Sequence, residues 1–268
     1  MPKNKPHYLI GLLLSALLVL TWGACGRKGF VVEGELDAGA DRTLYIEELT
    51  PRNGVRFVDS VRLDHRGHFS FRHTAPYATF YNLHTSETDY VVLQPNNGEK
   101  LHLVGSFDDL CRTYEIEGSP ESVLLWQLQD YSNLGVEALE RLREENRQNQ
   151  QSLSESEYLE AKRRTDSVYI ELYKQQREYV AHFIQQHEGS LTTLIALYKP
   201  FNINHPLINP ETDFSLFELV LEGLERELPD NPHTINFRNT VEQLRYRYGK
   251  QAASWTLDGA DNKTAYEE

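Results

Sequence analysis

Residues 55–73 read Val-Arg-Phe-Val-Asp-Ser-Val-Arg-Leu-Asp-His-Arg-Gly-His-Phe-Ser-Phe-Arg-His. β-Branched and aromatic residues alternate with polar ones over 55–63 and again over 68–73, which is typical of half-buried strands. Asp64-His65-Arg66-Gly67 separates the two runs as a turn. Asn53-Gly54 precedes them as a hairpin turn, because both residues tolerate positive φ. The segment therefore predicts successive antiparallel strands joined by short turns.

The same pattern extends in both directions from this segment and covers residues 25–118. Short apolar or alternating runs recur there, separated by turn residues such as those at 96–98. Such spacing is typical of an antiparallel β-sandwich or barrel, and both remain open. Strands are expected near 30–36, 42–48, 55–63, 68–73, 78–84, 89–94, 99–104 and 112–117.

Helical spacing replaces strand alternation over residues 119–249. Ser119-Pro120-Glu121 combines a capping hydroxyl, a proline at the first helical position and an acid in the first turn. Two long apolar stripes with three- and four-residue steps then predict an antiparallel αα-hairpin, whose turn lies in the polar stretch 143–156. Further helices are expected at 191–198, 214–228 and 234–248, with a loop at 201–210 and a tail at 250–268. The fold class is therefore α+β.

The first 24 residues have the organisation of a secretory signal peptide. Lys3 and Lys5 precede an apolar run from Tyr8 to Trp22, and the small residues Gly23 and Ala24 follow it. The run is shorter than the roughly 20 apolar residues that span a bilayer.

Small residues directly before Cys25 resemble the lipobox of bacterial lipoproteins, although Trp22 stands where that family usually has an aliphatic residue. The resemblance implies cleavage before Cys25 and a lipid on its thiol, so that a membrane is the first expected partner. Residues 26–29 carry no acids, unlike surface-exported lipoproteins of the Bacteroidetes type. The expected location is therefore the cell envelope, facing the periplasm from the outer membrane. Plain secretion and a retained membrane anchor are the alternatives.

Composition excludes several classes of function. The chain has 40 acidic and 27 basic residues, a formal net charge of −13, which argues against nucleic acid as a partner. Beside Cys25 only Cys111 remains, so an intramolecular disulfide and a cysteine zinc site are not expected, and Cys111 is read as a small core residue. No His pair has the i, i+4 spacing of a helical metal site, and neither a phosphate loop nor a Gly-x-Ser-x-Gly motif occurs. We therefore expect no metal and no cofactor.

Several segments resemble a β domain of unknown function found in Bacteroidetes-type envelope lipoproteins. They are Asp59 to Phe71, Gly98 to Gly105, and Tyr114 to Ser119. In that family a helical segment follows, and then commonly a thioredoxin-like domain of the thiol–disulfide interchange or peroxiredoxin-like kind. Residues 248–259 resemble the entry into such a domain, with Ala253 in place of the usual Pro.

The cysteine pair of such a redox domain does not occur in this sequence. Disulfide exchange needs a thiolate and a resolving cysteine in a Cys-x-x-Cys motif. The chain is therefore expected to be a non-catalytic binding or adaptor module, and the resemblance implies a periplasmic thiol–disulfide protein as a partner. Two alternatives stay open. One is a truncated fragment of a thiol–disulfide oxidoreductase, and the other is a nutrient- or glycan-binding lipoprotein, which an exposed aromatic platform on the sandwich would favour.

Two further positions carry a short motif. Asp59-Ser60-Val61 and Asp166-Ser167-Val168 resemble the O-glycosylation acceptor of the same bacterial group, which makes Ser60 and Ser167 candidate modification sites.

Overall fold

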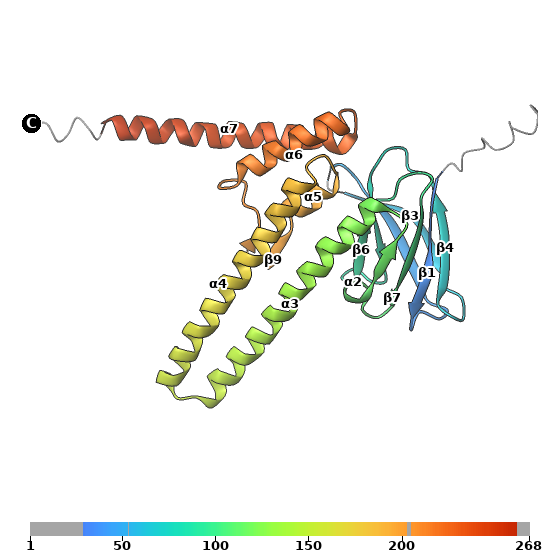
Figure 1. The fold of residues 1–268 in the computed structure, drawn as a ribbon, viewed down its shortest axis with the longest axis horizontal. Coiled ribbons are helices and arrows are strands. Elements are labelled where there is room, and N and C mark those ends of the chain that lie inside the picture. Colours follow the sequence, from blue (N-terminus) through green and yellow to red (C-terminus); the bar gives the residue numbers. More distant parts are fainter. Residues whose placement is uncertain (1–28, 53, 203–204, 262–268) are drawn as a thin grey trace, which may run out of the picture.

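A strand-rich half of the chain precedes a helix-rich half, as the sequence predicts, and the fold class is α+β (Figure 1). The computed structural model describes residues 29–52, 54–202 and 205–261. Eight strands come first: β1 (Phe30–Asp37), β2 (Thr43–Leu49), β3 (Val55–Arg62), β4 (His68–His73), β5 (Phe80–His84), β6 (Tyr90–Leu93), β7 (Lys100–Ser106) and β8 (Glu115–Glu117).

These strands form two four-stranded sheets, with the orders β4-β1-β7-β8 and β3-β2-β5-β6. Apolar side chains from both sheets share one core, among them Val32 and Leu101 from the first sheet and Ile46 and Leu83 from the second. Of the two architectures left open, the fold is thus the sandwich. One pairing departs from the antiparallel prediction, because β1 and β7 run parallel. The chain builds the second sheet between these two strands, and β7 returns beside β1 in the same direction.

The turn at Asp64–Gly67 has a different role from the predicted hairpin, because it joins an edge strand of one sheet to an edge strand of the other. The Asp64 carboxylate accepts hydrogen bonds from the backbone N–H groups of Arg66 and His68, at 2.8 and 2.9 Å. These bonds lower the pKa of Asp64 to about 2. Gly67 has φ +85°, and a Cβ there would lie 2.3 Å from the carbonyl oxygen of Leu36.

The predicted strand at 112–117 is wrong in its first half, where the short helix α2 (Leu110–Thr113) precedes β8. The backbone N–H groups of Leu110 and Cys111 each donate to the Asp89 carboxylate at 2.8 Å. This carboxylate caps the helix from a loop 21 residues away, so local pattern does not reveal it.

The predicted hairpin consists of α3 (Pro120–Ser152) and α4 (Glu155–Gln186), which extend away from the sandwich (Figure 1). Ser119 caps α3 by accepting a hydrogen bond from the N–H of Ser122, as its position predicts. The two helices come close at Gly135, which packs beneath Gln176, and the rings of Tyr131 and Tyr179 stack beside this contact at 3.6 Å.

The remaining elements are α5 (Thr192–Leu197), β9 (Pro200–Asn202), β10 (His205–Pro206), α6 (Phe214–Glu227) and α7 (Pro232–Asp261). Two predictions fail here. The expected loop at 201–210 contains the β9–β10 pair, and α7 continues to Asp261 instead of ending before Gly249. A single glycine costs a helix only about 1 kcal/mol, and the following Lys-Gln-Ala-Ala favours helix, so Gly249 does not end it.

The first turns of α3 join the sandwich to a second, helical core. Val123 and Trp126 pack against the sandwich core, while Leu125 and Leu128 belong to the helical core. The indole N–H of Trp126 also donates to the carbonyl of Tyr114 at 2.8 Å. One helix thus contributes to both cores and fixes the sandwich against the α4–α7 region.

Candidate functional site

The sequence-predicted site residues are not brought together by the fold. Cys25 lies outside the described residues. Ser60 is exposed on β3, where its backbone N–H donates to the Asp59 carboxylate at 2.7 Å. Ser167 is exposed on α4, and its hydroxyl donates to the carbonyl of Arg163 at 2.9 Å. Both serines are accessible to a modifying enzyme, and they lie on different parts of the molecule.

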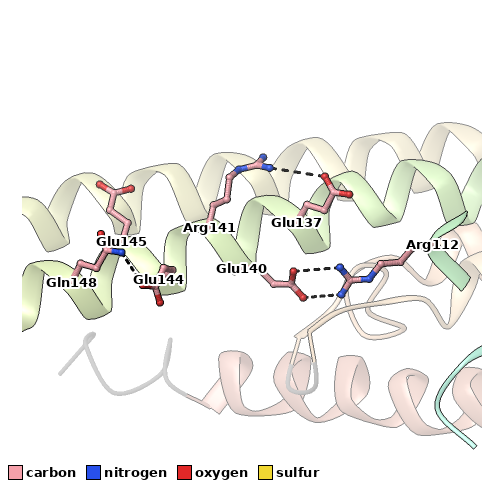
Figure 2. A pocket seen from close by; sticks show the side chains of 7 residues that line it. All are labelled: Arg112, Glu137, Glu140, Arg141, Glu144, Glu145 and Gln148. Atoms are coloured by element: carbon pink, nitrogen blue, oxygen red, sulfur yellow. Dashed lines mark hydrogen bonds and ion pairs between the residues drawn. The ribbon is translucent and has the colours of Figure 1, made fainter. Parts of the chain in front are cut away.

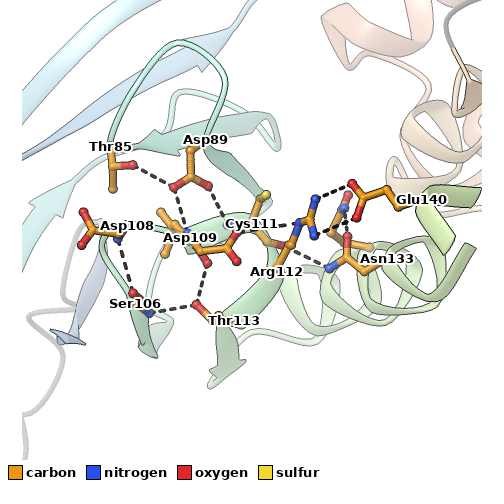
Figure 3. A network of polar contacts seen from close by, with 12 residues as sticks. Thr85, Asp89, Ser106, Asp108, Asp109, Cys111, Arg112, Thr113, Asn133 and Glu140 are labelled. Atoms are coloured by element: carbon orange, nitrogen blue, oxygen red, sulfur yellow. Dashed lines mark hydrogen bonds and ion pairs between the residues drawn. The ribbon is translucent and has the colours of Figure 1, made fainter. Parts of the chain in front are cut away.

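Cys111, expected in the core, is half-buried in α2 and belongs to a polar network between the sandwich and the hairpin (Figure 3). Burial raises the pKa of its thiol to about 11, and the nearby Asp89 carboxylate acts in the same direction. The thiol is therefore protonated at neutral pH and is a poor nucleophile.

The rest of this network holds α2 on α3. Arg112 forms two hydrogen bonds to the Glu140 carboxylate, at 2.9 and 3.5 Å, and the Asn133 amide donates to the Cys111 carbonyl at 3.1 Å (Figure 3). These contacts position elements, and none of them presents a reactive group to a ligand.

A hollow of about 620 Å³ lies along the outer side of α3, beside Arg112 (Figure 2). Glu137 and Arg141 line it and pair with each other along the same helix, and Glu144, also in its wall, pairs with Arg147 beside it. Hydrogen bonds from Arg147 and Gln148 lower the pKa of Glu144 to about 2. We interpret this hollow as part of the solvated charged face that the sequence predicts for the hairpin.

Three other titratable groups, Glu48 and His233 buried and Tyr77 half-buried, lie where sandwich and helices meet. Glu48 is only 1% exposed and pairs with Arg56, and the hydroxyl of Tyr77 lies 3.3 Å from its carboxylate. His233, at the start of α7, has its Nε2 2.8 Å from the Thr79 hydroxyl. Burial lowers the pKa of His233 to about 4, so the ring is neutral at physiological pH. The cluster acts as a joint between β5 and α7.

Lys199 lies in the connection between α5 and β9 and has a lowered pKa. Burial lowers the pKa of its amine to about 8, and the amine donates to the side-chain carbonyl of Gln129 at 2.9 Å. An amide cannot take up a proton at this pH, so the pair forms a partly buried hydrogen bond between the α5–β9 connection and α3. Across the residues that the structure describes, no group of three or more His, Cys, Asp or Glu side chains is arranged to hold a metal ion. None of the helices in those same ranges has the length and apolar character needed to cross a bilayer.

The outer face of the β3-β2-β5-β6 sheet carries a different kind of surface. Three large aromatic side chains are exposed there, Tyr45 at 41%, Phe57 at 61% and Tyr90 at 46%. They surround polar side chains that point to the same side of the sheet. We call this set the aromatic face, and it comprises Tyr45, Glu47, Phe57, Asn82, His84 and Tyr90.

Strand register places these residues in two neighbouring rows. Tyr45 on β2 pairs with His84 on β5, and His84 pairs with Tyr90 on β6, so the three cross the sheet side by side. In the next row Glu47 pairs with Asn82 on one side and with Phe57 on the other. Paired residues share a face of the sheet. The rings of Tyr45 and His84 stack at 5.4 Å with 24° between their planes.

The polar centre of the aromatic face is not saturated by hydrogen bonds. The amide oxygen of Asn82 and both ring nitrogens of His84 are shielded from solvent, and no hydrogen-bond partner occurs for them among the described residues. The closest charged group to His84 is the Glu47 carboxylate, 3.6 Å from Nε2 and beyond hydrogen-bond range. Shielded groups without partners are uncommon in folded proteins and often mark functional positions.

The helices cover only one end of this sheet face. Leu49, Phe80 and Val92 pack against the helical core, and Val92 pairs with Asn82, so the helices reach the β6 end of the row that contains Glu47. The row that contains Tyr45 lies farther along the strands. The sequence analysis missed the aromatic face, since Tyr45, His84 and Tyr90 become neighbours only through the pairing of three strands. The alternation Tyr45, Glu47 along β2 and Asn82, His84 along β5 was the available hint.

No family model, curated protein or solved structure matches this chain.

Proposed function

We propose that the chain is a non-catalytic binding module of the cell envelope, tethered through lipid on Cys25, and that the aromatic face is its ligand-contacting surface. The observation that carries this proposal is the group of three exposed aromatic rings around polar side chains on one sheet face. Exposed apolar patches with polar neighbours mark interaction sites on soluble domains. Tyrosine suits such sites because it offers a large rigid area and a polar tip.

The state of the titratable groups supports binding over catalysis. A nucleophilic or acid–base mechanism needs a reactive group beside a second group that shares its proton. The thiol of Cys111 is held protonated beside the Asp89 carboxylate. The His233 ring is buried and neutral, and its Nε2 lies against a hydroxyl group of the fold. These groups have structural partners instead of catalytic ones.

The anchor has its own test in the cells that make this protein. Wild-type chain should incorporate an alkyne-tagged palmitate and fractionate with membranes. The Cys25→Ser variant should lose both properties, whereas Cys111→Ser should keep them. Incorporation that persists in Cys25→Ser would contradict the anchor.

The binding surface is tested by site-specific photocrosslinking in living cells. A benzoylphenylalanine placed at Tyr45 or Tyr90 should form a discrete adduct, because both side chains are exposed on the aromatic face. The control is the same group at Tyr246, which is 66% exposed on α7. If the same adducts form at all three positions, or if no adduct forms at any of them, the aromatic face is not the binding surface. The thiol–disulfide partner implied by the family resemblance is one identity that the adduct can reveal.

A further inference from the structure

We infer that the end of the sandwich at which β1 begins faces the lipid bilayer, and that the α3–α4 hairpin projects away from it. We call this end the tether end, and it comprises the start of β1 with the β2–β3, β4–β5 and β6–β7 connections. The inference rests on the proposed lipid at Cys25 and adds the surface of the protein that meets the membrane.

The linker between the lipid and the sandwich is short. Only residues 26–28 lie between Cys25 and Gly29, where the described chain begins, so the two Cα atoms are at most about 14 Å apart. Gly29 itself is held at the tether end, because its carbonyl accepts a hydrogen bond from the N–H of Gly98 at 2.8 Å. β1 has eight residues and is about 26 Å long. The opposite end can therefore approach the bilayer only if the sandwich lies flat on it.

Strand pairing shows which connections lie at the tether end. β4 ends there, because its last residue, His73, pairs with Phe30 at the start of β1. β7 begins there, because it runs parallel to β1. β5 begins after the short connection from β4, and its first residue, Phe80, pairs with Leu49 at the end of β2. The β1–β2, β3–β4, β5–β6 and β7–β8 connections belong to the opposite end.

The two ends differ in charge. The three connections at the tether end hold one acid, Glu99, and one base, Arg52, and the linker adds Arg27 and Lys28. Asp230, in the turn between α6 and α7, is a further acid near this end. The connections at the opposite end hold three bases and six acids, namely Asp41, Asp64, Glu87, Asp89, Asp108 and Asp109.

This asymmetry favours an upright sandwich over one that lies flat. The chain as a whole has a formal net charge of −13, so an anionic lipid surface repels it. Repulsion acts over about one Debye length, roughly 8–10 Å at physiological salt, and therefore depends on which part of the protein is nearest the lipid. The tether end is nearly neutral and can lie at the headgroups, whereas the acidic end is kept away from them.

The helices follow from the same orientation. α3 begins at the tether end, because the hydroxyl of Ser119 donates to the carbonyl of Gln94 at 3.4 Å. With 33 residues this helix is about 50 Å long. The start of β1 and α7 lie on one side of the molecule, and the tip of the hairpin lies on the opposite side (Figure 1). A bilayer at the tether end thus leaves the hairpin tip far from the lipid.

The test measures how close three labelled positions come to lipid headgroups. The protein is the lipoprotein purified from the cells that make it, with Cys111→Ser, so that the proposed lipid occupies the Cys25 thiol. A fluorescent maleimide is attached to one introduced cysteine at a time, at positions that are all exposed. They are Asn96→Cys at the tether end, His65→Cys at the opposite end and Gln151→Cys at the hairpin tip. The vesicles contain phosphatidylethanolamine, phosphatidylglycerol and a lipid with a nitroxide quencher on its headgroup.

The label at Asn96 should be quenched at least about twofold more than the label at His65 or Gln151, because the short linker keeps the tether end within reach of the headgroups. Dissolved iodide without vesicles is the control and should quench all three labels to a similar extent. Circular dichroism melts identify a label that damages the fold, and Pro76→Cys in the exposed β4–β5 connection then replaces Asn96→Cys. Equal quenching by the vesicles at the three positions, or stronger quenching at His65 or Gln151, overturns the inference.

The palmitate experiment separates this inference from the proposed function. If palmitate is incorporated through Cys25 but the label at Asn96 is not preferentially quenched, the orientation is wrong and the anchor stands. If no palmitate is incorporated, the anchor and the orientation fall together, and the binding surface is still decided by the crosslinks at the aromatic face.

Discussion

Nε2 of His233 lies 2.8 Å from the hydroxyl of Thr79, although 154 residues separate them in the sequence. Thr79 precedes β5 in the sandwich, and His233 stands in the first turn of α7. Asn231 strengthens the same joint, since its amide donates to the carbonyl of Ala78 at 2.8 Å. Hydrogen bonds thus attach the start of α7 to the residues directly before β5, the strand that carries Asn82 and His84 of the aromatic face.

The joint predicts a pH-dependent stability. The pKa of His233 falls from its ordinary 6.5 to about 4 in the folded chain. Between these values the unfolded chain binds a proton that the folded chain does not. The neutral His233 ring should therefore make its full contribution to the free energy of unfolding above pH 6.5. That free energy should decrease from pH 6.5 toward pH 4, by at most about 3 kcal/mol.

Urea unfolding at several pH values between 4 and 7.5 measures the slope of the free energy of unfolding against pH. His233→Gln removes the titrating group and keeps a donor for Thr79, so the slope should flatten over this window. His65→Gln, in the exposed turn after β3, is the control and should leave the slope in place. The lowered pKa values of Asp64 and Glu144 contribute below about pH 5, so the slopes of the two proteins are compared between pH 5 and 7.5. An unchanged slope in His233→Gln would assign the pH dependence to other groups.

Two glycines with positive φ should differ in their tolerance of alanine. Gly67 and Gly98 have φ +85° and +98°, so a side chain strains the backbone at either position, by about 1–2 kcal/mol. At Gly67 the added Cβ also meets the Leu36 carbonyl at 2.3 Å, whereas nothing lies within 4 Å of it at Gly98. Gly67→Ala should therefore lower the free energy of unfolding by at least about 1 kcal/mol more than Gly98→Ala. If urea titrations give both variants the same loss in the free energy of unfolding, the backbone near Leu36 moves aside for the added Cβ at no cost.

Local pattern predicts the elements whose causes are local. The alternation in β3 and β4 and the Ser119-Pro120 start of α3 lie within a few residues, and the structure has all three. The carboxylate that makes α2 a helix belongs to Asp89, and the parallel pairing of β1 with β7 depends on how the chain crosses between sheets. Such long-range contacts leave little trace in the local sequence.

The same limit applies to the candidate site. Single residues such as Ser60 or Cys111 can be proposed from short motifs and composition. The row of Tyr45, His84 and Tyr90 exists only when β2, β5 and β6 pair in one register. A shift of one residue would turn these side chains toward the core, so the aromatic face is a property of the fold.

The Cys111 thiol should be slow to react in the folded chain. A pKa of about 11 in place of 9.0 lowers the thiolate fraction about 100-fold at pH 8. In a Cys25→Ser background, Ellman's reagent should label Cys111 far more slowly in buffer than in urea. Asp89→Asn removes a negative charge that opposes ionisation and should speed labelling of the folded chain. Equal labelling rates in buffer and urea would mean that the fold neither shields the Cys111 thiol nor raises its pKa.

The stability of the hairpin should depend on side-chain volume at Gly135, where α3 and α4 come close together. A Cβ on Gly135 would lie 2.7 Å from the side-chain amide of Gln176, which is buried and donates to the Tyr131 carbonyl at 3.1 Å. Gly135→Leu gains about 1 kcal/mol of helix propensity. Overpacking should outweigh this gain and lower the free energy of unfolding by about 1–3 kcal/mol.

A double-variant cycle tests whether Gln176 is the obstacle. Gln176→Ala removes the side chain over Gly135, so Gly135→Leu should cost less in that background than in the native one. Val136→Leu is the control on the exposed side of α3 and should change stability by less than about 0.5 kcal/mol. If the cost of Gly135→Leu is the same in both backgrounds, the close approach of the two helices does not depend on Gln176, and the steric limit lies in the backbone of α4.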